Sequence, residues 1–367
     1  MIRTSIGTIY GVLVALLLSS SVSAEPKQST ITKVTLNPTS FNPSQDKPIE
    51  LSYTLTKAEV VTVQVYDPDG GLVRTLVKEQ AQDAGTHQIT WDGQDEEQRV
   101  VPNEAYTLTI ETTSGSIYDP TTFSGGVVSD IKTARFKPGG SVVYQLPAAA
   151  RVLIRLGIHN GPLLKTLVDW TPRVAGSITE HWDGKDQDKL IDFHQHQQFS
   201  GLITYVTLPE TTVITYGNTK ESYRDYKLNR AQNRPQKPHR PRIADPQMRF
   251  RPTSLVPPTW ARAPQVLMTF PQTPDTSVPE VATAIETRID VDPSDRATLL
   301  DDQFEIAFFV DNVFFAEAER GYLPLNWHWD LTQLTAGEHI LTVNISSFKG
   351  QVGVASRKIK LIKTKEK

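Results

Sequence analysis

The sequence predicts an all-β protein in which β-sandwich domains follow one another along the chain. Apolar and polar residues alternate over short runs such as Leu51–Leu55 and Val61–Val65, which is the pattern of strands with one buried and one exposed face. Turns of the Asn/Asp-Gly type at Asp67–Gly71 and His159–Gly161 separate such runs and are typical of hairpins. We find no helix signal along the chain, so we expect strands throughout.

Residues 1–24 have the features of a secretory signal peptide. Arg3 precedes an apolar run from Ile9 to Leu18, and small residues ending at Ala24 follow it. This run is shorter than the ~20 residues needed to span a bilayer, and no later apolar stretch is long enough. We therefore expect cleavage after Ala24 and an extracytoplasmic protein, either periplasmic or secreted.

The chain has no cysteine, so packed cores must stabilise it. Its net charge of −3 argues against a nucleic-acid partner.

An internal repeat with an offset of 91 residues begins near Leu51 and runs without a gap to Asp95. Each copy ends in Trp-Asp-Gly-x-Asp, formed by Trp91, Asp92 and Gly93 in the first copy and by Trp182, Asp183 and Gly184 in the second. A repeating unit of about 90 residues fits an immunoglobulin-like sandwich, which has roughly 100 residues. We place the two domains at 31–113 and 130–216, with extra residues in the second copy in the stretch "KLIDFHQHQQF".

The first copy resembles the Ig-like domain of the flagellar hook-capping protein, through "SFNPSQDKPIELSYTLTKAEVVTVQVYDPDGGLVRTL" and "GTHQITWDGQDE". The resemblance covers roughly Ile31–Glu111 and, in more diverged form, Ala134–Leu208. It implies immunoglobulin-like sandwiches of a kind found in non-catalytic modules.

The third domain is predicted at 281–363, where the strands "FEIAFFV" and "GEHILTVNIS" lack the Trp-Asp-Gly signature. The order of residues from Leu334 to Val343 resembles another group of bacterial Ig-like domains. The predicted architecture is thus three immunoglobulin-like β-sandwiches in tandem, the last after a proline-rich basic linker at 217–280.

That linker differs in composition from its surroundings, with ten Lys/Arg against three acidic residues between Gly217 and Arg251. One interpretation is an extended, solvated spacer that trypsin cuts at sites such as Arg224, Lys227 or Arg230. Another is a cationic strap that binds an acidic polysaccharide or an acidic partner, with aromatic side chains stacking on sugar rings. The segment could also fold back onto acidic parts of the chain itself. The candidate binding residues are Tyr223, Tyr226, Arg230, Arg234, Lys237, Arg240, Arg242 and Trp260.

The Trp-Asp-Gly copies are interpreted as structural: the Trp caps a core, the Asp accepts backbone N–H bonds, and the Gly permits positive φ. The alternative is a calcium site built from Asp92, Asp95, Glu96 and Glu97, but calcium requires about 6–8 oxygen ligands and this spacing matches no known loop. We predict no metal site here and no cofactor.

The histidines of the inserted stretch, His194 and His196, lie two residues apart and could hold zinc, with His181 as a third candidate ligand. A solvated loop is the favoured interpretation, because a closed zinc site needs four ligands and the chain has no cysteine. No catalytic motif is present and no catalytic residue is assigned.

The expected function is an exported, non-catalytic binding or scaffolding protein of the bacterial cell envelope that recognises an envelope protein or an acidic polysaccharide. The alternative is an accessory subunit of an extracytoplasmic carbohydrate-active hydrolase, or such a hydrolase itself. A hydrolase requires carboxylates or histidines that converge in a cleft. The oligomeric state is left open.

Overall fold

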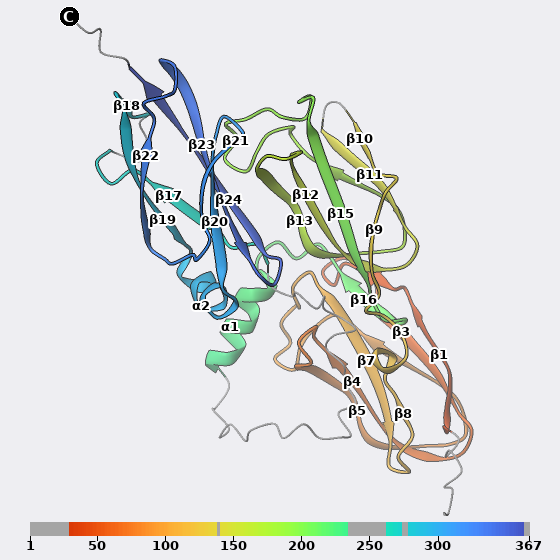
Figure 1. The fold of residues 1–367 in the computed structure, drawn as a ribbon. Coiled ribbons are helices and arrows are strands. Elements are labelled where there is room, and N and C mark those ends of the chain that lie inside the picture. Colours follow the sequence, from red (N-terminus) through yellow and green to blue (C-terminus); the bar gives the residue numbers. More distant parts are fainter. Residues whose placement is uncertain (1–28, 138–139, 234–261, 274–277, 363–367) are drawn as a thin grey trace, which may run out of the picture.

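The computed structural model describes residues 29–137, 140–233, 262–273 and 278–362, and these form three β-sandwiches (Figure 1). The all-β prediction is confirmed, with helices confined to short segments. The predicted signal peptide, 1–24, lies outside the described residues. No helix in the described ranges has the length and apolar character needed to cross a membrane.

The first sandwich packs a three-stranded sheet on a larger one. The small sheet has the order β1 (Ile31–Asn37), β3 (Ile49–Leu55), β6 (Gly85–Trp91). The larger has the order β2 (Ser40–Phe41), β16 (Thr212–Thr215), β7 (Ala105–Thr112), β4 (Glu59–Tyr66), β5 (Leu72–Gln82), with β8 (Ile117–Tyr118) paired to β7. The alternation seen in the sequence places Tyr53, Val63 and Trp91 in the core between the sheets.

One strand of this sandwich comes from a distant part of the chain. Strand β16 follows the second sandwich, yet it pairs in parallel with β2 and antiparallel with β7. Val213 enters the first core, whereas Ile214 packs with Ala105 and Leu208 outside it. The predicted second domain, 130–216, therefore includes a strand that the structure places in the first sheet. The stretch "TVIT" has no feature that selects one sheet edge over another, so tertiary packing decides its pairing.

The second sandwich repeats the first. Its small sheet has the order β10 (Arg135–Lys137), β11 (Ser141–Leu146), β14 (Gly176–His181), and its large sheet has the order β13 (Leu163–Arg173), β12 (Ala150–Ile158), β15 (Phe199–Thr207), β9 (Val128–Asp130). The repeat extends to unusual backbone angles. Glu79 and Trp170 have φ of 46° and 45°, and Gln98 and Lys189 have φ of 59° and 63°, each pair being separated by the 91-residue offset.

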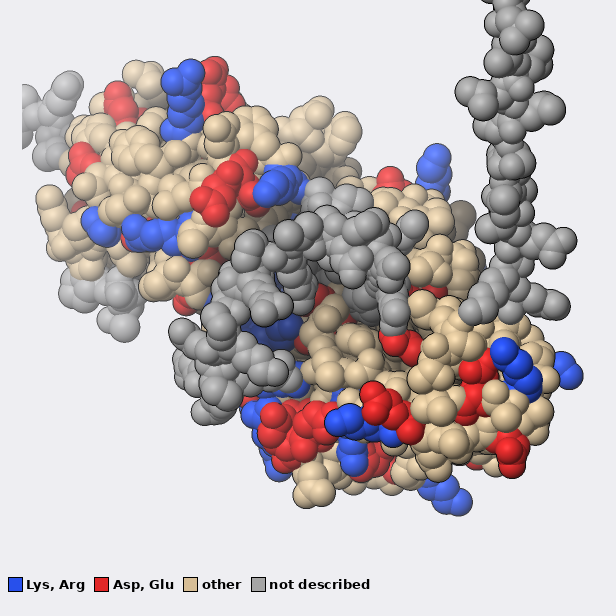
Figure 2. Space-filling model, turned by 90° about the horizontal axis from the view of Figure 1, so that it is seen from below, with Lys and Arg blue, Asp and Glu red and all other residues tan. Residues whose placement is uncertain are grey.

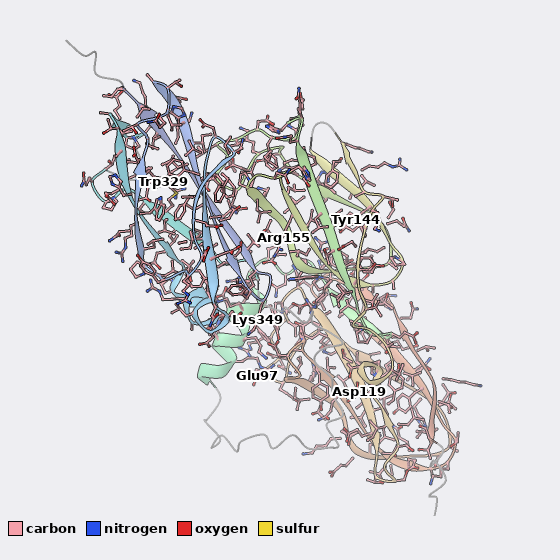
Figure 3. All side chains as sticks on the ribbon, viewed as in Figure 1. Glu97, Asp119, Tyr144, Arg155, Trp329 and Lys349 are labelled. Carbon is pink, nitrogen blue, oxygen red and sulfur yellow. The ribbon has the colours of Figure 1, made fainter. Side chains whose placement is uncertain are left out.

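The third sandwich encloses Trp329, which is fully buried between its sheets (Figure 3). One sheet has the order β17 (Val266–Thr269), β19 (Ala284–Val291), β22 (Leu325–Asp330). The other has the order β18 (Glu280–Val281), β24 (Val352–Leu361), β23 (Gly337–Ser347), β20 (Phe304–Val310), β21 (Val313–Ala318). Strand β17 lies inside the range predicted as linker, 217–280; its four residues, VLMT, are too few to show a strand pattern among the prolines.

The expectation of strands throughout is wrong at three places: η1 (Pro120–Thr122), α1 (Tyr223–Asn233) and α2 (Pro293–Asp302). The start of α1 is capped by Ser222, whose hydroxyl accepts from the Asp225 N–H and donates to its carboxylate. The start of α2 has Asp292 as N-cap and Pro293 at the first helical position. Both signals are present in the sequence, but a short polar helix carries no apolar stripe to support them.

The third sandwich lies beside the second, and α1 lies between the third and the first (Figure 1). Between the second and third, Asn344 exchanges two hydrogen bonds with the backbone of Leu163, at 2.8 and 2.9 Å. Arg155 occupies the space between these sandwiches (Figure 3) and donates to the Gly350 carbonyl oxygen at 2.5 Å. Asp188 accepts from the Ser356 N–H at 2.7 Å. Polar contacts therefore join the two sandwiches side by side.

Candidate functional site: helix α1 and the junction of the three sandwiches

The candidate binding residues fall into two groups. Tyr223, Tyr226 and Arg230 lie on α1. The others, Arg234, Lys237, Arg240, Arg242 and Trp260, lie outside the described residues. Figure 2 shows Lys/Arg and Asp/Glu side chains interspersed on one face of the molecule, without a broad area of one sign among the coloured residues.

Tyr226 anchors α1 to the first sandwich. It has no exposed surface, and its hydroxyl donates to Asp95 Oδ2 at 3.1 Å. The guanidinium groups of Arg99 and Arg230 lie 5.5 and 5.3 Å from the centre of its ring, within the range of cation–π contacts. Burial raises the pKa of Tyr226, and the neighbouring Asp95 adds to the rise, so the phenol stays protonated as a donor. Tyr226 is thus part of the fold and is not open to a sugar ring.

The remaining contacts of α1 with the first sandwich are polar. Lys227 Nζ binds Asp67 Oδ2 at 2.9 Å, and the hydroxyl of Tyr223 donates to Asp69 Oδ2 at 2.9 Å. Arg230, which is 6% exposed, donates from Nη2 to the Leu72 carbonyl oxygen at 2.8 Å. Burial, then the charges of Asp67 and Asp69, raise the pKa of Tyr223. Because the α1 cations contact acids and carbonyls of the same chain, this part of the basic segment folds back, as one of the sequence alternatives foresaw.

Helix α1 also reaches the third sandwich through Arg224. Its guanidinium group lies 3.9 Å from Asp292 and 3.5 Å from Asp295, at the start of α2. These groups are partly exposed, so the pair contributes at most about 1 kcal/mol. Arg224 therefore orients the third sandwich weakly, whereas Tyr226 holds α1 on the first.

A buried ion pair joins the first and second sandwiches. Arg151 Nη2 donates to Glu104 Oε1 at 2.7 Å, and neither residue exposes more than 5% of its surface. The same carboxylate oxygen accepts the Ala105 N–H, and Arg151 Nη1 donates to the Trp170 carbonyl oxygen. Burial raises the pKa of Glu104, while Arg151 opposes this rise. Removing one partner would leave a buried charge without its counter-ion, so the pair constrains how the sandwiches meet.

A cavity of 620 Å³ lies where α1 meets the three sandwiches. Four carboxylates line it, and each is already bonded to a donor in its surroundings. Glu104 binds Arg151, Asp69 binds Tyr223, Asp169 accepts the Ala263 N–H at 2.8 Å, and Asp295 accepts the Gln265 N–H at 3.0 Å. Burial raises the pKa of Asp169, and the Ala263 hydrogen bond opposes that rise.

The two Trp-Asp-Gly motifs make the same contacts. The indole N–H of Trp91 donates to the Gln94 carbonyl oxygen at 2.9 Å, and that of Trp182 donates to the Lys185 carbonyl oxygen at 2.8 Å. Each following Asp accepts the N–H two residues later, from Gln94 to Asp92 and from Lys185 to Asp183. The glycines have positive φ: 73° at Gly93 and 81° at Gly184. These are the contacts of a structural turn.

The acids considered as calcium ligands are bonded to protein donors instead. Asp95 is fully buried and accepts from the N–H of Glu97 and Arg99 as well as from the Arg99 side chain. Glu96 accepts the Thr75 N–H at 2.7 Å, and Glu97 lies 3.4 Å from Arg99. Among the described residues, no group of three or more His, Cys, Asp or Glu side chains is arranged to hold a metal ion.

The insertion of the second copy is anchored by Phe193. This side chain is fully buried, and its ring centre lies 5.1 Å from that of Trp182. His194 Nδ1 lies 2.5 Å from Asp192 Oδ1, while His196 Nδ1 accepts the Gln198 N–H at 3.1 Å. The histidines therefore bind groups within the loop, and no cleft with converging carboxylates forms around them in the described part of the chain.

Residues 39–116 match the sequence profile of the FlgD Ig-like domain. The resemblance to this module is therefore confirmed in the first copy. No curated protein sequence matches the chain.

Among solved structures, the chain is similar to the CbhA fibronectin(III)-like modules of Clostridium thermocellum, at 11% identity over 91% of this chain and 97% of that chain, with a TM-score of 0.22. It is also similar to a tetra-tandem repeat in the extending region of a large adhesion protein, at 11% identity over 92% and 75% of the two chains, with a TM-score of 0.21. A third similarity is to a 1.5-MDa bacterial ice-binding adhesin, at 12% identity over 90% and 98%, with a TM-score of 0.21. These TM-scores are low, so the description of the fold rests on the sheets themselves.

Proposed function

We propose that this chain is an exported, non-catalytic binding or scaffolding protein of the bacterial cell envelope, extracytoplasmic after cleavage behind Ala24. Its partner is an envelope protein or a glycan. The observation that carries the proposal is the junction: the buried Glu104–Arg151 pair joins the first and second sandwiches, and the Asn344–Leu163 hydrogen bonds join the second and third. A fixed junction presents side chains from all three sandwiches as one composite surface.

The role is non-catalytic in this proposal because the carboxylates at the junction already accept hydrogen bonds from protein donors. Two-carboxylate hydrolysis needs one carboxyl group that can give its proton to the substrate and a second that faces the substrate as base or nucleophile. The raised pKa of Glu104 would suit an acid, but its Oε1 is held by Arg151 and by the Ala105 N–H. The alternative, a carbohydrate-active hydrolase or its accessory subunit, would require these bonds to break.

The test uses residues 25–367 and purified bacterial envelope fractions. Co-sedimentation should show saturable binding, and assays for new reducing ends or released peptides should show no turnover. Release of reducing ends that depends on Glu104 or Asp169 would establish the hydrolase instead. Absence of binding to every envelope fraction would refute the proposed function.

A further inference from the structure

We propose that the cavity at the three-sandwich junction binds a short, uncharged oligosaccharide. This inference rests on the proposed function and names a partner class for it. The cavity volume of 620 Å³ falls within the ~300–1,000 Å³ of ligand sites. A second cavity of 390 Å³ adjoins it through Asp169, Arg262, Pro264 and Asp295, which line both.

The charges of the cavity favour an uncharged ligand. Three cations, Arg224, Lys227 and Arg262, line it together with Asp69, Asp169 and Asp295. Lys227 lies 3.4 Å from Asp69, and Arg224 and Arg262 lie 3.5 and 3.9 Å from Asp295. The fourth carboxylate, Glu104, is paired with Arg151, which is outside the lining. Such a surface offers donors and acceptors in similar number without attracting either sign. Each sugar hydroxyl both donates and accepts, so a saccharide can satisfy both kinds of group.

The cavity also has apolar walls for the C–H faces of sugar rings. Tyr223, which is half-buried, contributes aromatic surface, and Leu228, which is 51% exposed, extends it. Trp170 also lines the cavity, but it is only 7% exposed because it packs on Leu153 and Val206. In the adjoining cavity, the Thr166 hydroxyl is buried without a hydrogen-bond partner in the described structure, which favours a polar ligand there.

A peptide would need a different surface. Extended peptides commonly bind by adding a strand to a sheet edge, and strand β13 does present an edge to the cavity. That edge is interrupted by the bulge at Trp170 and by Pro172, which has no N–H to donate. Bulges and prolines are the features that prevent strand addition. Recognition at this site must therefore come from side chains, as it does for a saccharide.

The experiment titrates residues 25–367 with cellotriose, mannotriose and chitotriose, followed by calorimetry and saturation-transfer NMR. Trigalacturonate and trialanine serve as charged and peptide competitors. At least one neutral trisaccharide should bind at millimolar concentration or below. Binding of trigalacturonate or trialanine alone, or of none of the five, would overturn the inference.

Two variants locate the site. Thr298→Trp places a large ring in the cavity from an exposed position on α2, and Arg262→Gln replaces the guanidinium group that lines both cavities with a neutral amide that has fewer donors. Each should weaken trisaccharide binding by at least about tenfold. Leu300→Trp, on the same helix but outside the lining and 49% exposed, is the matched control and should bind like the parent. Circular dichroism melting curves confirm that the variants fold.

The same variants separate this inference from the proposed function. If Thr298→Trp and Arg262→Gln bind trisaccharides like the parent, the inference fails. The proposed function would still stand if the parent sedimented with envelope fractions, because its partner would then bind another surface. If no envelope binding occurs, the proposed function fails independently of the trisaccharide result.

Discussion

Replacing Tyr226 by Ala should release helix α1 from the first sandwich. The ring is fully buried, so its removal costs about 3–5 kcal/mol in transfer and cavity terms. An isolated helix of 11 residues is marginal in water, and the other α1 contacts are largely polar ones of small net value. A loss of about 3 kcal/mol raises the undocked population roughly 150-fold.

Limited trypsin digestion measures this release. The three α1 sites, Arg224, Lys227 and Arg230, were expected from the sequence to be the exposed cleavage points of a linker, whereas docking should protect them. Cleavage that follows the undocked population should accelerate about 100-fold or more in Tyr226→Ala. Tyr226→Phe, which loses only the bond to Asp95, should accelerate cleavage several-fold because a hydrogen bond contributes about 0.5–1.5 kcal/mol.

Leu228→Ala is the control, since Leu228 is half exposed on the same helix. It should be cut at the parent's rate. The reasoning is refuted if trypsin cuts the parent at these three bonds as fast as it cuts Tyr226→Ala, because α1 would then contribute no protection.

Three further predictions concern the sandwiches. Trp182→Ala should lower the unfolding free energy of the second sandwich by about 3–5 kcal/mol in denaturant titration, while EDTA should leave the parent's melting temperature unchanged; an EDTA-induced drop of several degrees would contradict the turn assignment. Glu104→Ala should cost about 3–5 kcal/mol because Arg151 stays buried without its counter-ion, and Glu104→Leu combined with Arg151→Met should recover much of the loss; equal loss in both would contradict this. Burial alone would lower the pKa of His339, but its hydrogen bonds to Asp311 and to the Thr335 carbonyl oxygen outweigh burial and raise it. The protonated ring thus stabilises the third sandwich, and this contribution is fully present below the unfolded pKa of about 6.5. It is lost as the pH rises through the higher folded pKa. His339→Gln should remove this part of the pH dependence of stability.

The sequence was sufficient to predict the sandwiches because their signals are local. Alternation over β3 and β4 specifies which side chains are buried, and the 91-residue repeat transfers that pattern to β11. Strand β12 departs from it, because nearly all of its residues are buried. The Trp-Asp-Gly turn needs only residues within a few positions of one another, so its hydrogen bonds could be anticipated from spacing.

The elements that escaped prediction depend on long-range contacts. Strand β16 has four buried residues and no turn that fixes its register, and its partners lie more than 100 residues away. Helix α1 has a capping signal at Ser222, but its polar composition gives no apolar stripe. The cavity could not be foreseen for the same reason, since its walls come from segments as distant as Asp69 and Gln351.

The choice of docking site for α1 nonetheless has a cause that is visible in the repeat. Lys227 and Tyr223 bind Asp67 and Asp69, which belong to the first turn "YDPDGG". At the offset of 91 residues the second copy has Ile158 and Asn160 in their place, so it offers no carboxylate to either side chain. The two sandwiches therefore share a fold but differ in charge at this turn, and only the first offers the acidic side chains that a basic helix can bind. Because β16 has already returned the chain to the first sandwich, α1 begins next to the copy that carries both acids, and connectivity and charge select the same site.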